Sequence, residues 1–197
     1  MKEAAAMCGR FQMTPEAWSA ASRLASIPSF IEIPLGFIYP GTLSLVLTAA
    51  ENHPDSLTGE LAKFGWKWKA DRPLQINARS ETAWTSPLFG PHMRHDRAVI
   101  PASCFFEWTP AKEMISCREP ESPVLYMAGF VTDGSFVILT TKANDSIRDI
   151  HHRMPLVLRE DQVTPWIRDE AAARRMTDLT PPEMITRPAL FEQPRLF

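Results

Sequence analysis

Two apolar runs joined by Asp133-Gly134 constrain the fold of this chain more than any other feature. Val124–Thr132 and Phe136–Lys142 are rich in β-branched and aromatic residues. An Asp-Gly pair between two such runs is typical of the two-residue turn of a β-hairpin. Further strands are predicted at Leu43–Thr48, Leu61–Trp68 and Ala98–Trp108. We therefore expect a single β-rich α+β domain, with the strands forming a curved sheet or an open barrel and a few helices at its periphery.

Proline residues mark where the predicted helices begin or stop. Eighteen prolines against eight glycines indicate many short elements joined by stiff turns. Thr14-Pro15 predicts a helix with Thr14 as its N-cap, which ends before Pro28. A short helix is expected over 144–150, and Thr164-Pro165 predicts the start of a last helix. Loops are predicted over Trp84–Arg97 and Thr109–Ser122, and a surface-wrapping tail over Pro181–Phe197.

The composition excludes some classes of protein. A net charge of −2 and a pI near 6.2 give no global signal for nucleic-acid binding, although a local arginine-lined groove is compatible with both values. The three cysteines show no CxxC spacing and follow no secretory signal, so we expect a cytoplasmic protein. No apolar run is long enough to span a membrane. The five histidines and three cysteines form no convincing set of metal ligands, and we expect neither a metal nor another cofactor.

Cys8 in Met7-Cys8-Gly9-Arg10-Phe11 has two interpretations. An internal cysteine behaves as a small apolar residue in a strand. If translation starts at Met7, or if processing removes residues 1–7, Cys8 becomes the first residue of the chain. Its α-amine and its thiol, with pKa values of about 8 and about 8.5, would then both be available as nucleophiles at neutral pH.

Three other polar residues also have both a structural and a functional interpretation. Asn77, in the polar cluster Asn77–Thr82, fits a helix cap or a site residue. Glu107 lies between aromatic residues and, in a strand, points to the face opposite Phe106 and Trp108. It is then either solvent-facing or a carboxyl group in an apolar pocket with a raised pKa, able to act as acid and base. His151, in the pair His151-His152, fits a structural or a proton-transfer role.

Taken together, these segments resemble the SRAP family, the SOS response-associated peptidases. They follow the family's order from about Cys8 to Leu158. The matching segments are Cys8–Phe11, Tyr39–Gly41, Ile76–Thr82, Arg97–Trp108, Leu139–Thr141 with Ala143-Asn144, and Ile150–Pro155.

The resemblance implies a protein of the DNA damage response that recognises abasic sites in single-stranded DNA. It would form a covalent cross-link to the open-chain aldehyde of the abasic sugar. The α-amine of Cys8 would attack the aldehyde to give an imine, and the Cys8 thiol would then close a thiazolidine ring. Because both groups belong to one residue, the ring closure has a large proximity advantage.

The resemblance also implies roles for individual residues. Glu107 and His151 would transfer protons, and Asn77 would hold the reacting groups in position. Phosphates beside the lesion would be bound by Arg10, Arg79 and Arg153. Single-stranded bases would stack against Trp66 or Trp68, and Pro40 would also contact the DNA.

The chain departs from the family pattern in two places. Residues 1–7 form a leader before the SRAP domain at 8–197, and the thiazolidine reaction requires that this leader is absent or removed by autoproteolysis. The Phe64–Trp68 region is shorter than the usual Trp-Gly stretch of the family, and the C-terminal end lacks a Pro-Val-Ser segment. We expect a monomer that binds no membrane and, if bacterial, associates with the nucleoid. The alternative functions are a thiol peptidase or amidase that acts on other polypeptides and a noncovalent reader of modified DNA bases.

Overall fold

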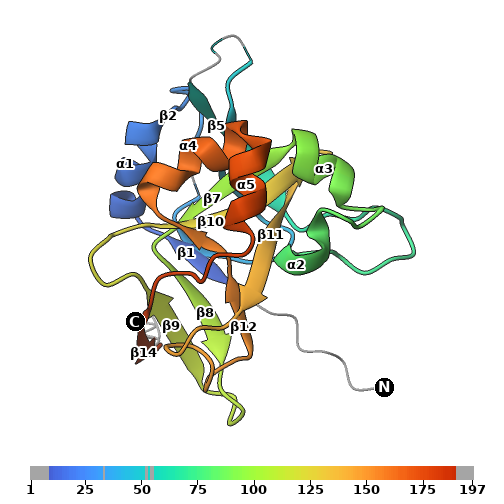
Figure 1. Ribbon diagram of the computed structural model, residues 1–197. Helices are drawn as coiled ribbons and strands as arrows, with labels where there is room; N and C mark the ends of the chain where they lie inside the picture. Colours follow the sequence, from blue (N-terminus) through green and yellow to red (C-terminus); the bar gives the residue numbers. More distant parts are fainter. Residues whose placement is uncertain (1–8, 33, 52, 54–55, 190–197) are drawn as a thin grey trace.

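The structure is a computed structural model that describes residues 9–32, 34–51, 53 and 56–189. Short strands dominate it, and the helices lie around them (Figure 1). In chain order the elements are β1 Phe11–Met13, α1 Pro15–Leu24, β2 Ala25–Ser26, β3 Gly36–Ile38, β4 Leu43–Ala49, β5 Leu57–Phe64, β6 Asn77–Arg79, α2 Ser80–Ala83, α3 Gly90–His95, β7 Arg97–Ala102, β8 Cys104–Trp108, β9 Met114–Arg118, β10 Leu125–Thr132, β11 Ser135–Lys142, β12 Arg153–Pro155, β13 Val157–Leu158, α4 Glu160–Arg168, α5 Glu170–Met176 and β14 Ile185–Pro188.

The strands form two sheets. The larger sheet has nine strands, and five of them close on themselves in the order β11-β10-β7-β4-β5, because β5 pairs in parallel with the first residues of β11. The smaller sheet has five strands in the order β14-β9-β8-β1-β3. The expectation of a single β-rich α+β domain with a curved sheet and peripheral helices is therefore confirmed.

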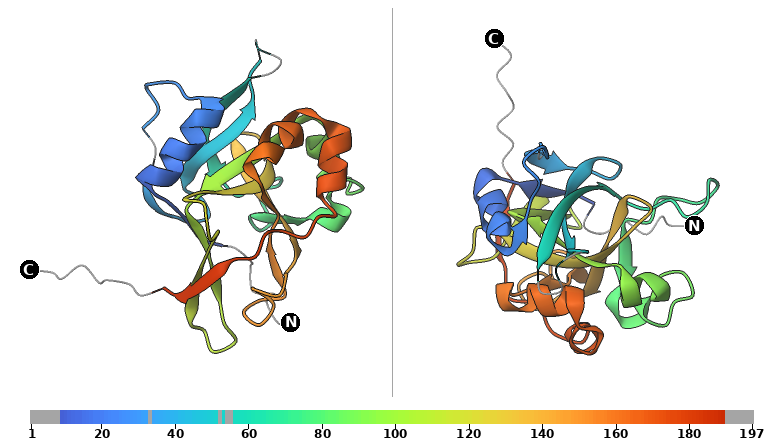
Figure 2. Two further views of the ribbon diagram at one scale, coloured as in Figure 1. Left: turned by 60° about the vertical axis from the view of Figure 1, so that its left-hand side comes forward. Right: turned by 90° about the horizontal axis from the view of Figure 1, so that it is seen from above.

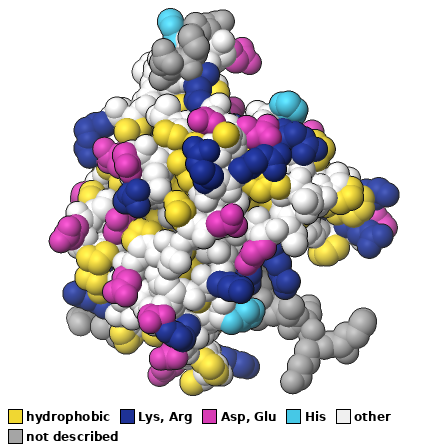
Figure 3. Space-filling view, viewed as in Figure 1, with side chains coloured by type: hydrophobic (Ala, Val, Ile, Leu, Met, Phe, Trp, Pro, Cys, Tyr) yellow, Lys and Arg dark blue, Asp and Glu magenta, His cyan; other side chains and the backbone are white. Residues whose placement is uncertain are grey.

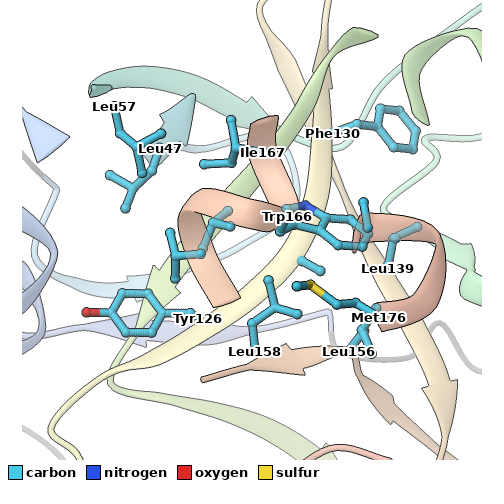
Figure 4. Packing of buried hydrophobic residues seen from close by; sticks show 14 of the residues in the cluster. Leu47, Leu57, Tyr126, Phe130, Leu139, Leu156, Leu158, Trp166, Ile167 and Met176 are labelled. Atoms are coloured by element: carbon cyan, nitrogen blue, oxygen red, sulfur yellow. The ribbon is translucent and has the colours of Figure 1, made fainter. Parts of the chain in front are cut away.

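Side-chain alternation divides the interior into two hydrophobic cores. Along β4, Leu45 and Leu47 enter one core while Val46 enters the other, and Val99 and Ile100 of β7 divide in the same way. The first core lies between the larger sheet and the helices α1, α4 and α5. Figure 4 shows Trp166 of α4 at its centre, among the side chains that line this core. The second core lies between the larger and the smaller sheet, because both contribute buried residues to it.

The elements with the strongest local sequence signals form where they were predicted. Thr14 caps α1 with its side-chain oxygen, which accepts a hydrogen bond from the backbone N–H of Ala17. The predicted hairpin joins β10 to β11, and Asp133 and Gly134 have φ angles of +48° and +65°, as a tight turn of this type requires. Strand β5 lies four residues earlier than predicted, and it ends at Phe64 because Gly65 adopts a φ of +95°.

Several predicted loops and helix starts are wrong. The predicted loop at 84–97 contains α3, and the predicted loop at 109–122 contains β9, which pairs with β8 and β14. Helix α4 begins at Glu160 and not at Pro165, because Arg159 is its N-cap and donates its backbone N–H to the Gln162 side chain at 2.9 Å. The predicted helix at 144–150 is a series of turns, held by hydrogen bonds from Ser146 to the Asn144 side chain.

The helices do not cover both sheets equally. Figures 1 and 2 show them gathered around the larger sheet, with no helix beside β8, β9 and β14 of the smaller sheet. Within the predicted tail at 181–197, residues 185–188 form β14, an edge strand of the smaller sheet, and residues 190–197 lie outside the described residues. Among the described helices, none combines the length and the apolar character that a bilayer crossing needs.

Candidate active site and nucleic-acid interface

The segments that carry the four candidate catalytic residues meet at the second core. Phe11 follows Cys8 by three residues, Ile76 precedes Asn77, Phe105 lies two residues before Glu107, and Met154 lies three residues after His151. All four apolar residues are buried in the same hydrophobic cluster. Cys8 itself and the leader at 1–7 lie outside the described residues. The fold thus brings together segments that are up to about 140 residues apart in the sequence.

Glu107 is the most deeply buried of the described candidates. It lies on β8 with 2% of its surface exposed, opposite Ile115 of β9. On the other side of β8, strand β1 pairs Phe11 with Phe105, and a hydrogen bond from Phe106 N to Arg10 O extends this alignment toward Glu107. Burial, and then the nearby Glu107 carboxylate, raise the pKa of the Cys117 thiol. Of the two sequence interpretations, the solvent-facing one is wrong, because Glu107 is buried.

Asn77 begins β6, which pairs in parallel with β11 so that Asn77 lies opposite Ile138. Its Nδ2 is buried and has no hydrogen-bond partner among the described residues, and the same is true of Ser80 Oγ in α2. A buried donor without a partner is uncommon in a folded protein and costs free energy. Asn77 is therefore not a helix cap, and its amide is available to a ligand oxygen. The sequence pattern marked Asn77 as a candidate site residue. It gave no reason to regard Ser80 as anything other than a possible helix cap.

His151 is half-buried just before β12, which pairs with the end of β11. Its Nδ1 accepts a hydrogen bond from Arg153 N at 3.1 Å, and its ring centroid lies 4.3 Å from that of the exposed His152. Burial lowers the pKa of His151; the hydrogen bond with the Arg153 backbone acts against this, and electrostatic repulsion from the His152 and Arg153 side chains adds to it. Because an imidazole must be neutral to accept a proton, His151 is suited to the role of a base.

Arg153 and Glu81 join the Asn77 segment to the His151 segment. The Arg153 guanidinium binds both carboxylate oxygens of Glu81 at 2.8 Å and also donates to the hydroxyl and carbonyl oxygens of Thr140. Arg153 is 7% exposed, and Glu81 has its pKa lowered chiefly by the hydrogen bonds from Arg153. The family resemblance implied a phosphate contact at Arg153, but the structure gives this guanidinium an internal partner. No sequence signal marked Glu81 as that partner.

The other predicted DNA contacts lie in different environments. Arg79 and Pro40 are exposed. Trp66 is 8% exposed, donates a hydrogen bond from Nε1 to Asp133 and packs edge-on against His92. The protein therefore covers most of this ring. Trp68 is half-buried, with Lys69 Nζ 4.9 Å and the Arg72 guanidinium 5.6 Å from its ring centroid.

Arg10 lies among aromatic rings. Its guanidinium carbon is 4.6 Å from the ring centroid of Tyr39, 5.4 Å from that of Trp108 and 5.9 Å from that of Phe37. These distances are in the range of cation–π contacts. Figure 3 shows basic and acidic side chains interspersed over the visible face of the molecule. On this face, basic side chains therefore form no extended patch free of acidic ones.

The described residues contain no group of three or more His, Cys, Asp or Glu side chains arranged to hold a metal ion. The candidate site residues contribute carboxyl, imidazole and amide groups, which are suited to proton transfer and to hydrogen bonding with a sugar.

Comparison with known proteins adds independent information. The chain is 32% identical to the abasic site processing protein YedK of Escherichia coli (strain K12) over 194 residues, which cover 88% of this chain and 85% of that protein. It is 28% identical to the abasic site processing protein YoqW of Bacillus subtilis (strain 168) over 185 residues, covering 82% and 80% of the two chains.

Solved structures share the fold. A crystal structure of a protein from Bordetella bronchiseptica superposes with a TM-score of 0.76 at 19% identity, covering 93% of this chain and 100% of that one. A phage-related protein from the same organism gives a TM-score of 0.74 at 22% identity, covering 94% and 95%. The family model described as SOS response associated peptidase (SRAP) matches residues 7–188. This match spans nearly the whole chain, and the protein therefore belongs to the SRAP family.

Proposed function

We propose that this protein processes abasic sites in single-stranded DNA by forming a thiazolidine cross-link through Cys8 as the first residue of the mature chain. The observation that carries the proposal is the convergence of four polar segments on one buried cluster, with the Glu107 carboxyl group 2% exposed beside the start of β1. The names of the relatives, abasic site processing proteins, support the same substrate.

The reaction needs an aminothiol close to a proton donor and acceptor. Consecutive Cα atoms are about 3.8 Å apart, so Cys8 Cα lies within about 8 Å of the Cα of Arg10, whose carbonyl oxygen is hydrogen-bonded to β8. The Cys8 amine adds to the C1′ aldehyde of the open sugar, and water leaves as the imine forms. The Cys8 thiol then adds to the imine carbon, and its proton passes to the nitrogen as the ring closes.

Glu107, His151 and Asn77 take separate roles in this proposal. Glu107 protonates the departing oxygen and then accepts a proton, since a buried carboxyl group beside the start of β1 can serve as both acid and base. The lowered pKa of His151 keeps its imidazole neutral, so it accepts the proton released as the sugar ring opens. The Asn77 amide, whose Nδ2 has no partner among the residues that the structure describes, donates a hydrogen bond to a sugar oxygen.

The leader at 1–7 must be absent before the amine can react. Initiation at Met7 followed by removal of this methionine gives that product, and the family match begins at Met7. Autoproteolysis gives it as well, because the Cys8 thiol can attack the carbonyl carbon of Met7 and water can then hydrolyse the resulting thioester. Both routes leave Cys8 with a free α-amine.

Arg79 is proposed as a phosphate contact and Pro40 as a surface contact for DNA, because both are exposed. Trp68 is proposed to contact bases together with Lys69 and Arg72. We do not propose DNA contacts for Trp66 and Arg153, because their polar atoms have internal partners.

The decisive experiment incubates protein that begins at Cys8 with a single-stranded oligonucleotide carrying one abasic site, followed by a denaturing gel. We expect a shifted band without any added reductant, and no such band for Cys8→Ala or for protein that retains residues 1–7. A cross-link formed by the chain with its leader still attached would contradict the proposal. Cleavage of unrelated peptides without a DNA adduct would instead indicate a thiol peptidase, and binding seen only on a native gel would indicate a noncovalent reader.

A further inference from the structure

An apolar groove beside β5 takes no part in the proposed reaction. Its volume is about 510 Å³, and it is lined by Pro28, Phe30, Ile31, Glu32, Glu60 and Leu61. Phe30 is 83% exposed, the highest value among the large apolar side chains of the described residues. A phenyl ring that stands in water beside an apolar groove indicates a surface that another segment covers.

Two segments form the walls of this groove. Ile27 packs on β5 at Gly59, where an added Cβ would lie only 2.8 Å from Ile27 Cγ1. The chain then leaves β5 in a turn, in which Ile31 N donates a hydrogen bond to Pro28 O at 3.0 Å. The groove opens between this turn and Leu61 of β5. One wall of the groove is therefore anchored on the larger sheet.

The edge of β5 is uncovered along the groove. Strand β2 pairs with residues 57–58 of β5, and β11 pairs with residues 63–64. For residues 59–62, β4 is the one partner strand within the described residues. Lys63 N donates to the backbone of the β10–β11 turn, away from β4, and in an antiparallel pair the N–H and C=O of Leu61 then point the same way. An extended segment is thus suited to pair with β5 at this point.

The rim of the groove is acidic. Glu32 and Glu60 are both exposed, and in the part of the chain that the structure describes neither forms an ion pair. Glu60 Oε1 accepts a hydrogen bond from Thr48 Oγ1 at 3.2 Å. The groove therefore favours a segment that carries large apolar side chains next to a lysine or an arginine.

The segment that follows β14 has this composition. Residues 190–197, which lie outside the described residues, have the sequence Leu-Phe-Glu-Gln-Pro-Arg-Leu-Phe. Four of these eight residues are leucine or phenylalanine, and Arg195 stands directly before Leu196. Segments that remain in solvent are typically poor in such apolar residues. Burial of these side chains on an apolar surface is favourable.

The position of β14 brings this segment within reach of the groove. Ala189, the last described residue, lines a neighbouring groove together with Phe37 of β3. Phe30 and Phe37 are at most about 25 Å apart along an extended chain, and Gly36 shortens this path with a φ of +98°. The eight residues after Ala189 span up to about 29 Å. Figures 1 and 2 show β14 on the same side of the molecule as α1, the helix that leads to Pro28.

We propose that residues 190–197 bind in the groove beside Phe30 of the same chain. Leu196 packs against the Phe30 ring, and the Arg195 guanidinium pairs with the acidic rim. The bound segment joins β14 of the smaller sheet to β5 of the larger sheet. Its binding is independent of the reaction at Cys8, and the test needs no DNA.

Trypsin cleavage after Arg195 tests the proposal on the full chain, with the initial rate followed by mass spectrometry. Because cleavage requires the unbound segment, we expect the unchanged protein to be cleaved several-fold more slowly than a synthetic peptide of residues 188–197. Phe30→Ser should raise the rate several-fold. The matched control is Leu179→Ser, which removes another exposed apolar side chain and should leave the rate unchanged. Both side chains are largely in water, so the fold should not change.

The double variant Glu32→Gln/Glu60→Gln tests the acidic rim separately. It should also speed cleavage, by a smaller factor than Phe30→Ser, and its difference from the unchanged protein should disappear at high salt. The control is Glu113→Gln/Glu121→Gln, which removes the same charge from exposed positions elsewhere.

Three results would overturn the proposal. The unchanged protein is cleaved as fast as the free peptide, or Phe30→Ser and Leu179→Ser are cleaved at the same rate. The third is a rate for the unchanged protein that depends on protein concentration, because the segment would then bind a second copy of the chain.

Discussion

Arg97 on the helix-covered side of the larger sheet contrasts with Arg10 on the smaller sheet. Arg97 is 6% exposed, and its guanidinium donates to four backbone carbonyl oxygens, those of Met93, Arg94, Trp166 and Ile167, at 2.6 to 3.0 Å. It thereby satisfies the C-terminal carbonyl groups of both α3 and α4. Arg10 has a buried Nε without a partner among the described residues, and its Nη1 donates to a sulfur atom.

This difference indicates that the region around Arg97 mainly stabilises the fold, whereas the region around Arg10 is suited to binding a ligand. Around Arg97 the helices close the first core, and the Arg97 guanidinium is paired within the chain. Around Arg10, and in the Asn77 segment, Arg10 Nε and Asn77 Nδ2 have no partner within the described part of the chain. Such a donor is stable only if the rest of the fold compensates, and it is useful only if a ligand supplies the acceptor. We therefore expect substitutions near Arg97 to change the free energy of unfolding, and substitutions near the smaller sheet to change DNA capture.

The largest effect is expected for Glu107→Gln in protein that begins at Cys8. If Glu107 is the proton carrier that we propose, its loss should lower the rate constant for capture of an abasic oligonucleotide by roughly 10²–10⁴-fold. Stability should change little, because a neutral amide is less costly to bury than a carboxylate. Gel-based capture kinetics and urea unfolding check the two halves of this statement. A large loss of stability with unchanged capture would give Glu107 the role that we assign to Arg97.

Arg97→Leu should show the opposite pattern. The substitution leaves four carbonyl groups without their donor, and we expect the free energy of unfolding to fall by about 3–5 kcal/mol. Urea unfolding monitored by tryptophan fluorescence measures this change. The control is Arg94→Ala at the neighbouring exposed position, for which a change within about 0.5 kcal/mol is expected. If the two variants were equally stable, the contrast between the two regions would not hold.

Glu81→Gln sharpens the comparison, because the Arg153–Glu81 pair lies between the two cases. Arg153 keeps its contacts with Thr140, and the Glu81 side chain is 38% exposed, so we expect a loss of about 1–2 kcal/mol, reduced by solvent screening. The folded-state pKa of Glu81 is lowered. Ionised Glu81 therefore contributes fully to the free energy of unfolding above the pKa of an ordinary glutamate. This contribution is lost as the pH falls through the lower pKa that Glu81 has in the folded state.

The pH dependence gives a direct check of this assignment. Unfolding free energies of the unchanged protein should fall more steeply below about pH 4.5 than those of Glu81→Gln. Parallel curves for the two proteins would show that the pair contributes no pH-dependent stability.

The smallest effect is expected at His151, in a different pH window. Its folded-state pKa is lowered, so the unfolded chain binds a proton that the folded chain does not, as the pH falls below about 6.5. Stability should decrease by a fraction of a kcal/mol over that window, and His151→Gln should remove the decrease. The control is His152→Gln at the exposed neighbouring position. Equal behaviour of the two variants in pH-dependent unfolding would contradict the role of burial at His151.

The sequence by itself determined the elements whose signals are local. Thr14-Pro15 specifies the start of α1, and Asp133-Gly134 specifies the β10–β11 hairpin, because capping and turn geometry depend on a few neighbouring residues. Local sequence signals did not predict β9, because this strand is formed by pairing with β8 and β14. They also placed the start of α4 at Pro165, although Arg159 and Gln162 set that boundary. The ordered motifs from Cys8 to Pro155 were enough to indicate the SRAP family, which the family match confirms.

Only the tertiary structure decided which polar groups are paired. Arg79 and Arg153 both stand in arginine-containing motifs, yet one is exposed while the other binds Glu81 from 72 residues away. Trp66 and Trp68 are equally plausible stacking residues in the sequence, yet one donates a hydrogen bond to Asp133. The physical reason is that a strand or a turn is selected by neighbours along the chain. The partner and the burial of a side chain, by contrast, are selected by residues that only folding brings near.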